Sequence, residues 1–173
     1  LGNGGTAGSI TGNIVDNGIL ALNRSDDVVV ANTISGTGAL VKNGTNTTTL
    51  TGSNSYAGTT TVSSGTLVVN GNQSAATGAT TVASGATLGG TGTLGGNVAV
   101  ASGASFSPGA PGAIGTLTIN GNLSFGATST LGYSFGQAAV PGGPLNDLAN
   151  VGGNLVLDGT VNVTPTPGGS FGA

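Results

Sequence analysis

The sequence predicts an all-β parallel β-helix, or β-solenoid, with roughly 20 residues in each coil. One short phrase recurs at about this spacing: TTVSSGTL starts at Thr60, TTVASGATL at Thr80 and VAVASGASF at Val98. A second phrase, GTLVVNGN at Gly65, returns as GTLTINGN at Gly115. A motif of this period indicates a solenoid, because so short a coil can bury its apolar face only against the next coil.

Each phrase reads as a short strand that ends in a turn. Apolar residues alternate with period two, as in Leu67 and Val69 or Leu117 and Ile119, which turns one face of the strand inward. Glycine supplies the turn dihedrals, and Asn-Gly and Asp-Gly pairs favour turns. In chain order, strands of this kind are expected within 12–18, 60–72, 80–88, 96–106, 115–126, 131–135 and 153–159.

Asn-Gly between apolar runs is also a hairpin signal, so a sandwich of antiparallel hairpins is the rival fold. The same turn residues recur at equivalent repeat positions, and the inward residues recur one coil later. Stacked coils account for both observations, which favours the solenoid. About eight coils with a spacing of about 4.8 Å would form a rod about 40 Å long.

The whole chain, residues 1–173, is interpreted as a single β-helical unit, and both of its ends read as cut within a longer solenoid. The stretch 137–150, with sequence QAAVPGGPLNDLAN, breaks the repeat with two prolines and two glycines. We expect it to form a loop that projects from the rod.

Composition excludes several classes of function. The two basic residues, Arg24 and Lys42, are far apart in sequence and the net charge is −3, which argues against nucleic-acid binding. The chain has no Cys and no His, so it has no disulfide, no thiol or imidazole catalysis and none of the common zinc sites. We predict no catalytic residue, no cofactor and no metal site.

One cluster supports an alternative, enzymatic hypothesis. Arg24, Asp26 and Asp27 lie together in the sequence. Parallel β-helices also occur among polysaccharide lyases and hydrolases, which use paired carboxylates as acid and base, or carboxylates that hold calcium with an arginine as the base. On a strand, Arg24 and Asp26 would face the same side. The simpler interpretation is an exposed turn that carries solubilising charges.

Two further patterns are interpreted as structural. Gly90, Gly92 and Gly95 spell GxGxxG, but no helix pattern follows them, so they indicate coil corners and not a phosphate loop. Asp147 and Asp158 could each supply an oxygen to calcium, but a calcium site needs at least six oxygens. Asp158 precedes Gly159 and is interpreted as a turn former.

The segment 39–72 resembles the passenger-associated transport repeat of Gram-negative autotransporters. Its matching core comprises Leu40, Lys42 and Gly44, then TLTGSNSYAG at 49–58 and TTVSSGTLVV at 60–69. The later stretch 92–163 is similar to the passenger segment that precedes the outer-membrane barrel in that family.

The resemblance implies a right-handed β-helix that is secreted by the type V route through the outer membrane and displayed at, or released from, the cell surface. In that family such a segment is a non-enzymatic stalk and folding core, which implies adhesive or virulence-associated presentation here. The expected partners are host-cell or matrix ligands, other copies of the chain, and the cognate outer-membrane β-barrel, whose strands are absent from residues 1–173. No nucleic-acid partner is expected.

Overall fold

The chain folds into a parallel β-helix, as the repeat period predicts. The structure is a computed structural model and describes residues 1–170. Every ladder between its strands is parallel, and the one antiparallel contact is an isolated bridge between Ala110 and Ala113. The prediction of a β-solenoid is therefore confirmed, and the antiparallel hairpin sandwich is excluded.

The described residues form twenty strands. In chain order they are β1 (Ile14–Val15), β2 (Ile19–Leu22), β3 (Val28–Val30), β4 (Ile34–Ser35), β5 (Ala39–Lys42), β6 (Thr47–Leu50), β7 (Thr60–Val62), β8 (Thr66–Val69), β9 (Asn72–Gln73), β10 (Thr80–Val82), β11 (Thr87–Gly90), β12 (Thr93–Leu94), β13 (Val98–Val100), β14 (Ser105–Pro108), β15 (Thr116–Ile119), β16 (Leu123–Phe125), β17 (Thr130–Gln137), β18 (Leu148–Val151), β19 (Leu155–Val156) and β20 (Thr160–Ser170).

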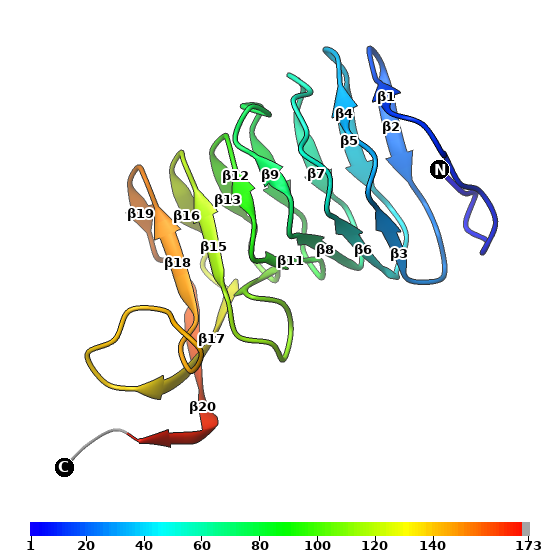
Figure 1. Cartoon of the computed structure of the whole chain (residues 1–173). Coiled ribbons are helices and arrows are strands. Elements are labelled where there is room, and N and C mark those ends of the chain that lie inside the picture. The colour runs from blue at the N-terminus through cyan, green and yellow to red at the C-terminus, as the bar shows by residue number, and fades with distance from the viewer. Residues whose placement is uncertain (171–173) are drawn as a thin grey trace.

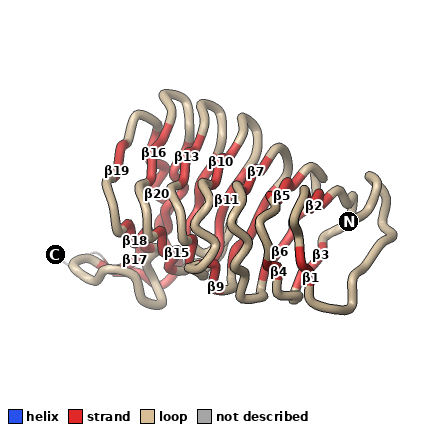
Figure 2. The backbone as a smooth tube through the Cα atoms, turned by 90° about the horizontal axis from the view of Figure 1, so that it is seen from above, coloured by secondary structure: helices blue, strands red, loops and turns tan. Residues whose placement is uncertain are grey.

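The strands form three faces that run along the rod (Figure 1). Face 1 consists of β2, β5, β7, β10, β13, β16 and β19, and face 2 of β3, β6, β8, β11, β14, β17 and β20. Face 3 contains β9, β12, β15 and β18, and the separate pair β1–β4 takes the same place in the earlier coils. Faces 1 and 2 thus hold seven stacked strands each, one fewer than the eight coils expected. Figure 2 shows the coils side by side between the two termini.

Coil length is regular at first and then grows. Partners in face 1 are 20 residues apart at Leu40–Thr60 and Thr60–Thr80, and 18 apart at Thr80–Val98. They are 25 apart at Val98–Leu123 and 32 apart at Leu123–Leu155. The additional residues lie mainly in the connections after β14 and after β17, and the face 1 ladders keep their register across them. In face 2, the β17–β20 ladder shifts its register at the end of β17.

Inward side chains stack into apolar columns. In face 2, Leu67, Leu88, Phe106 and Leu131 succeed one another in register. Phe106 is fully buried, and its ring meets that of Phe125 edge-on, with centroids 5.7 Å apart and an interplanar angle of 87°. These columns form one continuous core that runs from the first coils to β17. The large apolar side chains of β19 and β20, in the last coil, are exposed.

The GxGxxG glycines are coil corners, as the sequence indicates. A Cβ atom on Gly90 or Gly92 would lie 2.1 or 2.2 Å from a carbonyl oxygen of the preceding coil, and one on Gly95 would lie 2.5 Å from another. Gly90 also has a φ of +126°, which other residues adopt rarely. Close stacking of backbone corners therefore explains this motif.

The stretch 137–150 is only partly a loop. β17 continues through Gln137 and β18 begins at Leu148, so the connection is 138–147 (Figure 1). The expected loop range therefore includes two strand ends. The last residues of the connection, Asn146 and Asp147, are each 1% exposed, so this end of the connection packs against the rod.

Candidate functional site

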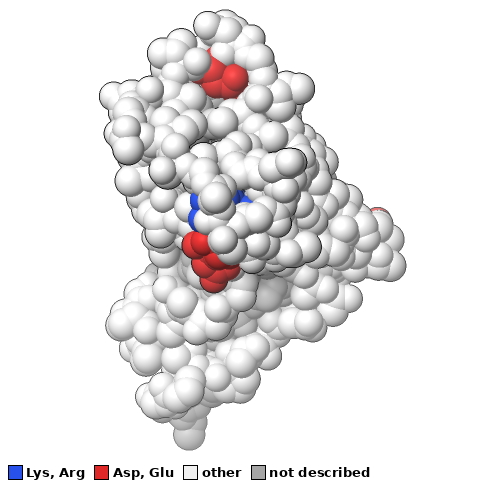
Figure 3. Space-filling model, turned by 90° about the vertical axis from the view of Figure 1, so that its right-hand side faces the viewer, with Lys and Arg blue, Asp and Glu red and all other residues white. Residues whose placement is uncertain are grey.

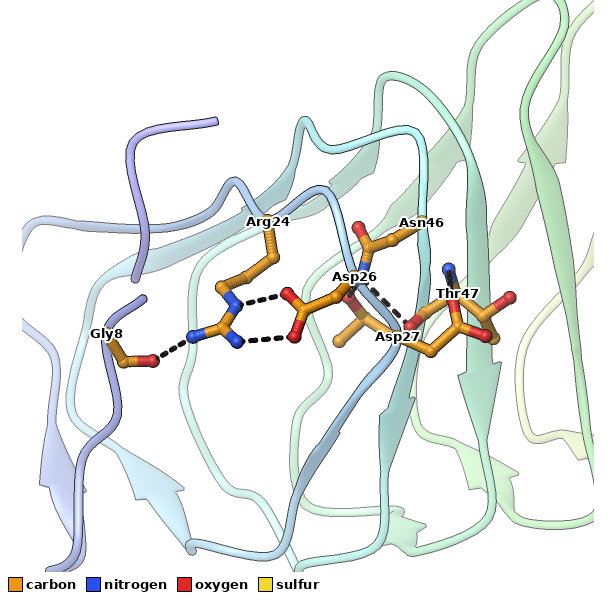
Figure 4. Close-up of polar contacts among 7 residues, drawn as sticks. Gly8, Arg24, Asp26, Asp27, Asn46 and Thr47 are labelled. Atoms are coloured by element: carbon orange, nitrogen blue, oxygen red, sulfur yellow. Dashed lines mark hydrogen bonds and ion pairs between the residues drawn. The ribbon is translucent and has the colours of Figure 1, made fainter. Parts of the chain in front are cut away.

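The proposed catalytic cluster lies in the turn between β2 and β3 and not on a strand (Figure 4). Arg24 grips Asp26 with two hydrogen bonds, Nε to Oδ1 at 2.8 Å and Nη2 to Oδ2 at 2.7 Å, and its Nη1 donates to the carbonyl of Gly8. The hydrogen bonds from Arg24 hold the pKa of Asp26 below its ordinary value, and the same hydrogen bonds raise the pKa of Arg24. Arg24 is therefore engaged in holding the turn and the N-terminal segment.

Asp27 points away from this ion pair (Figure 4). Its Oδ1 accepts a 2.7 Å hydrogen bond from the backbone N–H of Thr47, one coil later. The two adjacent carboxylates thus have different partners: Asp26 bonds Arg24 within its own turn, whereas Asp27 links the turn to the next coil. The arrangement is that of a structural turn, with no carboxylate pair facing a common cleft.

Lys42, far from Arg24 in sequence, comes to the same corner of the rod. Gly44 links the two, because a Cβ atom on Gly44 would lie 2.1 Å from the carbonyl oxygen of Arg24, while the Gly44 carbonyl accepts from Lys42 Nζ. Figure 3, which views the N-terminal end, shows basic and acidic atoms in one patch on a largely uncharged surface. Figure 3 also shows a second acidic patch apart from this one, so the charges of the early coils are only partly grouped.

The side chain of Lys42 points into the rod. It has no exposed surface and stands in the column between Leu22 and Val62. Its Nζ donates to the carbonyls of Gly44 and, at 3.3 Å, Ser64. Burial lowers the pKa of Lys42, and the charge of Asp27 opposes this effect in part.

Replacing Lys42 with methionine should change how stability depends on pH. Because the pKa of Lys42 is lower in the folded chain than its ordinary value of 10.5, the folded chain loses this proton at a lower pH than the unfolded chain does. Between these two pKa values the unfolded chain binds more protons, so the free energy of unfolding of the wild type rises with pH relative to that of Lys42→Met. At neutral pH the variant should be as stable as the wild type or more stable by up to about 1 kcal/mol, because no buried charge remains. Urea unfolding at neutral pH and above pH 10.5 measures both effects.

Tyr56 also titrates at high pH, but its contribution to the free energy of unfolding is the same in the wild type and in Lys42→Met and cancels in the comparison. Burial raises the pKa of this phenol, whose hydroxyl bonds Thr60 at 2.6 Å, so ionisation of Tyr56 lowers stability at high pH in both proteins. Parallel stability profiles for the wild type and Lys42→Met would contradict the assignment of a buried, titrating Lys42.

A groove of about 340 Å³ crosses the outer surface of face 1, and we call it the Asn groove. Its floor is a register column of small or medium side chains: Thr81, Ala99, Ser124 and Val156. One wall is an asparagine ladder in which Asn97 Oδ1 accepts from the N–H of Asn122 at 2.9 Å, and Asn122 Oδ1 accepts from the N–H of Asn154 at 2.8 Å. Among the described residues the groove has no charged lining residue, and its lining combines amide, hydroxyl and aliphatic side chains.

The sequence contains a signal for this asparagine ladder. A Gly-Asn phrase recurs as GNVAV at Gly96, GNLSF at Gly121 and GNLVL at Gly153, and it supplies Asn97, Asn122 and Asn154. That phrase predicts turns, but the spacings of 25 and 32 residues between these asparagines hide their alignment. Only the stacking of unequal coils brings them together.

Asn146 and Asp147 are buried and accept hydrogen bonds from backbone N–H groups of other segments, and we call this pair of side chains the Asp147 clasp. The Oδ1 atom of Asp147 accepts from the N–H of Gly115 at 2.8 Å and its Oδ2 from the N–H of Ser134 at 2.6 Å. The neighbouring Asn146 accepts from the N–H groups of Gly136 and Gln137. Both Asp147 oxygens therefore serve the backbone and join three parts of the chain.

Residues 1–170 contain no group of three or more acidic, His or Cys side chains placed to hold a metal ion. Asp158 is exposed in the turn between β19 and β20. The same residues contain no helix that could span a membrane.

Comparison with known proteins gives two similarities. Residues 40–69 and 64–88 match the model of the passenger-associated transport repeat. Over 166 residues the chain is 57% identical to a protein described as "Adhesin BmaC autotransporter" from Brucella suis biovar 1 (strain 1330). This alignment covers 95% of the chain and 5% of the relative, so the chain corresponds to a small part of that protein's length.

Proposed function

The chain belongs to the autotransporter passengers that carry the passenger-associated transport repeat, and we propose that it is a rigid, non-enzymatic stalk and folding core within a longer exported adhesin. The observation that carries this proposal is the unbroken stacking of seven strands in both face 1 and face 2. Each coil pairs with the next through backbone hydrogen bonds and buried columns, so the rod resists bending and can hold other segments away from the membrane.

Export through the outer membrane to the cell surface suits the chemistry of this chain. It has no cysteine, so no disulfide closes a loop that a secretion pore would have to pass. The relative that it resembles is named as an adhesin autotransporter. We infer that the rest of the passenger and the cognate outer-membrane β-barrel belong to the same longer polypeptide.

The adhesive partners fall into two classes. Host-cell or matrix ligands would be bound by the whole passenger, in which this segment supplies reach. Other copies of the chain could associate along its neutral Thr- and Asn-rich faces. The Asn groove supports an uncharged polar partner in either class, because amide and hydroxyl groups form its polar lining.

The enzymatic alternative, a lyase or hydrolase that uses Asp26 and Asp27, has less support. Arg24 already holds Asp26, and Asp27 already accepts the backbone N–H of Thr47. A general acid or base needs to reach a substrate proton, which these bonds oppose.

Removing these coils from the full-length adhesin should weaken bacterial attachment, while the isolated chain should show no cleavage of polysaccharides. A matched protein in which a different β-helical segment of equal coil number replaces them should recover attachment, because a stalk contributes length. Failure of that replacement would show a specific ligand-binding role. Polysaccharide cleavage by the wild-type chain that disappears in Asp26→Asn/Asp27→Asn would contradict the non-enzymatic proposal.

A further inference from the structure

Five Asn-Gly pairs occur in the chain, and all five asparagines are exposed: Asn3, Asn17, Asn43, Asn70 and Asn120. Asn-Gly is the dipeptide in which the following backbone nitrogen most readily attacks the asparagine side chain, because glycine offers no side-chain hindrance. Exposure does not separate the five pairs, so the state of each glycine N–H must decide which can react.

Four of the five glycine N–H groups are hydrogen-bonded. Gly4 donates to Asn23 O at 2.9 Å, Gly18 to Asp16 Oδ1 at 3.0 Å, Gly44 to Leu22 O at 3.3 Å and Gly71 to Leu50 O at 2.9 Å. In two of these pairs the asparagine side chain is also held, since Asn17 Oδ1 and Asn70 Oδ1 each accept from a threonine one coil later. Hydrogen bonds therefore occupy the nucleophile in these four pairs, through contacts between segments in three of them and through a local side-chain contact at Gly18.

The Gly121 N–H is different, because it donates to no acceptor within residues 1–170. At this corner the asparagine ladder takes the next N–H along the chain, because Asn97 Oδ1 accepts from Asn122. The Asn120 side chain likewise forms no hydrogen bond with any described residue, although its backbone N–H donates to Leu94 O at 2.9 Å. Both reacting groups of this pair are thus free at the corner between β15 and β16.

We propose that Asn120-Gly121 is a self-modification site at which the folded chain converts Asn120 to aspartate or isoaspartate. The Gly121 nitrogen loses its proton to base and bonds to Cγ of Asn120, while the Cγ–Nδ2 bond breaks and ammonia leaves. Water then opens the resulting succinimide at either carbonyl. The only co-reactant is water, and no electron is transferred to or from the chain.

The product would alter the Asn groove. Asn120 lies two residues before Asn122, which forms part of the ladder and of the groove lining. Conversion adds one negative charge to a chain of net charge −3, beside a groove that has no charged lining residue. Conversion of Asn120 would therefore mark older molecules and disfavour anionic ligands in the groove.

The test is deamidation of the purified chain in mildly alkaline buffer, followed by peptide mapping with a protease that does not depend on the two basic residues. Mass spectrometry then follows the modification of each asparagine over time, and fragmentation distinguishes isoaspartate from aspartate. Asn120 should react in the folded chain at close to its rate in urea. Each of the other four asparagines should react at least about tenfold more slowly in the folded chain than it does in urea, because local structure protects it.

Two variants serve as matched controls. Asn120→Thr should abolish nearly all of the early mass gain of the folded chain, whereas Asn70→Thr should leave it unchanged. The proposal is overturned if Asn120 is protected in the folded chain to the same degree as the others. Faster reaction at any of the other four pairs would overturn it as well.

Discussion

Replacing Asp147 with alanine is expected to lower the free energy of unfolding by about 3 kcal/mol. The substitution leaves the N–H groups of Gly115 and Ser134 without their acceptor at a site where Asp147 is 1% exposed. A buried donor that loses its partner costs about 1–3 kcal/mol, and two donors are affected. Chemical denaturation of the purified chain measures the loss.

Asp158→Ala is the matched control, because Asp158 is exposed. That change should shift stability by no more than about 0.5 kcal/mol. Asp147→Asn should fall between the two alanine variants, since an amide oxygen can replace only one carboxylate oxygen. If Asp147→Ala costs no more than Asp158→Ala, the clasp does not stabilise the fold.

Phe106→Ala should destabilise the chain by about 4 kcal/mol. Phe106 is fully buried, lies between Leu88 and Leu131 in its column and contacts the ring of Phe125 edge-on. Alanine would leave a cavity in the middle of the stack, and two neighbouring coils cannot close it without breaking their ladder. Urea unfolding monitored by circular dichroism gives the change.

Phe106→Leu provides the control for this cavity. Leucine matches the residues above and below it in the column, so its cost should be about 1 kcal/mol. Equal losses for Phe106→Leu and Phe106→Ala would show that the aromatic edge contact dominates. A loss below about 1 kcal/mol for Phe106→Ala would contradict continuous packing between these coils.

Much of the fold could be predicted because its causes are local and repeated. The alternation at Leu117 and Ile119 gives the inward face, and the corner glycines give the turns. The repeat match at 40–69 and 64–88 includes Lys42, but the motif alone does not reveal that this side chain points inward between Leu22 and Val62. Its direction follows from the register of neighbouring coils.

The candidate sites were less predictable than the fold. Arg24, Asp26 and Asp27 are the densest charges in the sequence, and the Arg24–Asp26 pair is local. The other partners, Gly8 for Arg24 and Thr47 for Asp27, come into contact only after the coils stack. The Asn groove was missed, because its ladder joins asparagines separated by 25 and 32 residues. Asp147 was expected in a projecting loop and is instead a buried acceptor.

By itself, the sequence determined that this chain is an all-β solenoid of short coils, that glycines form its corners and that it resembles autotransporter passengers. These properties depend on period, turn chemistry and motif, all of which are written along the chain. Tertiary structure alone decided which polar groups meet across coils: the Lys42 carbonyl contacts, the Asp147 clasp, the Asn groove and the free Gly121 N–H. The physical reason is that coil length varies from 18 to 32 residues, so the partner of a side chain is set by stacking register and not by its distance in sequence.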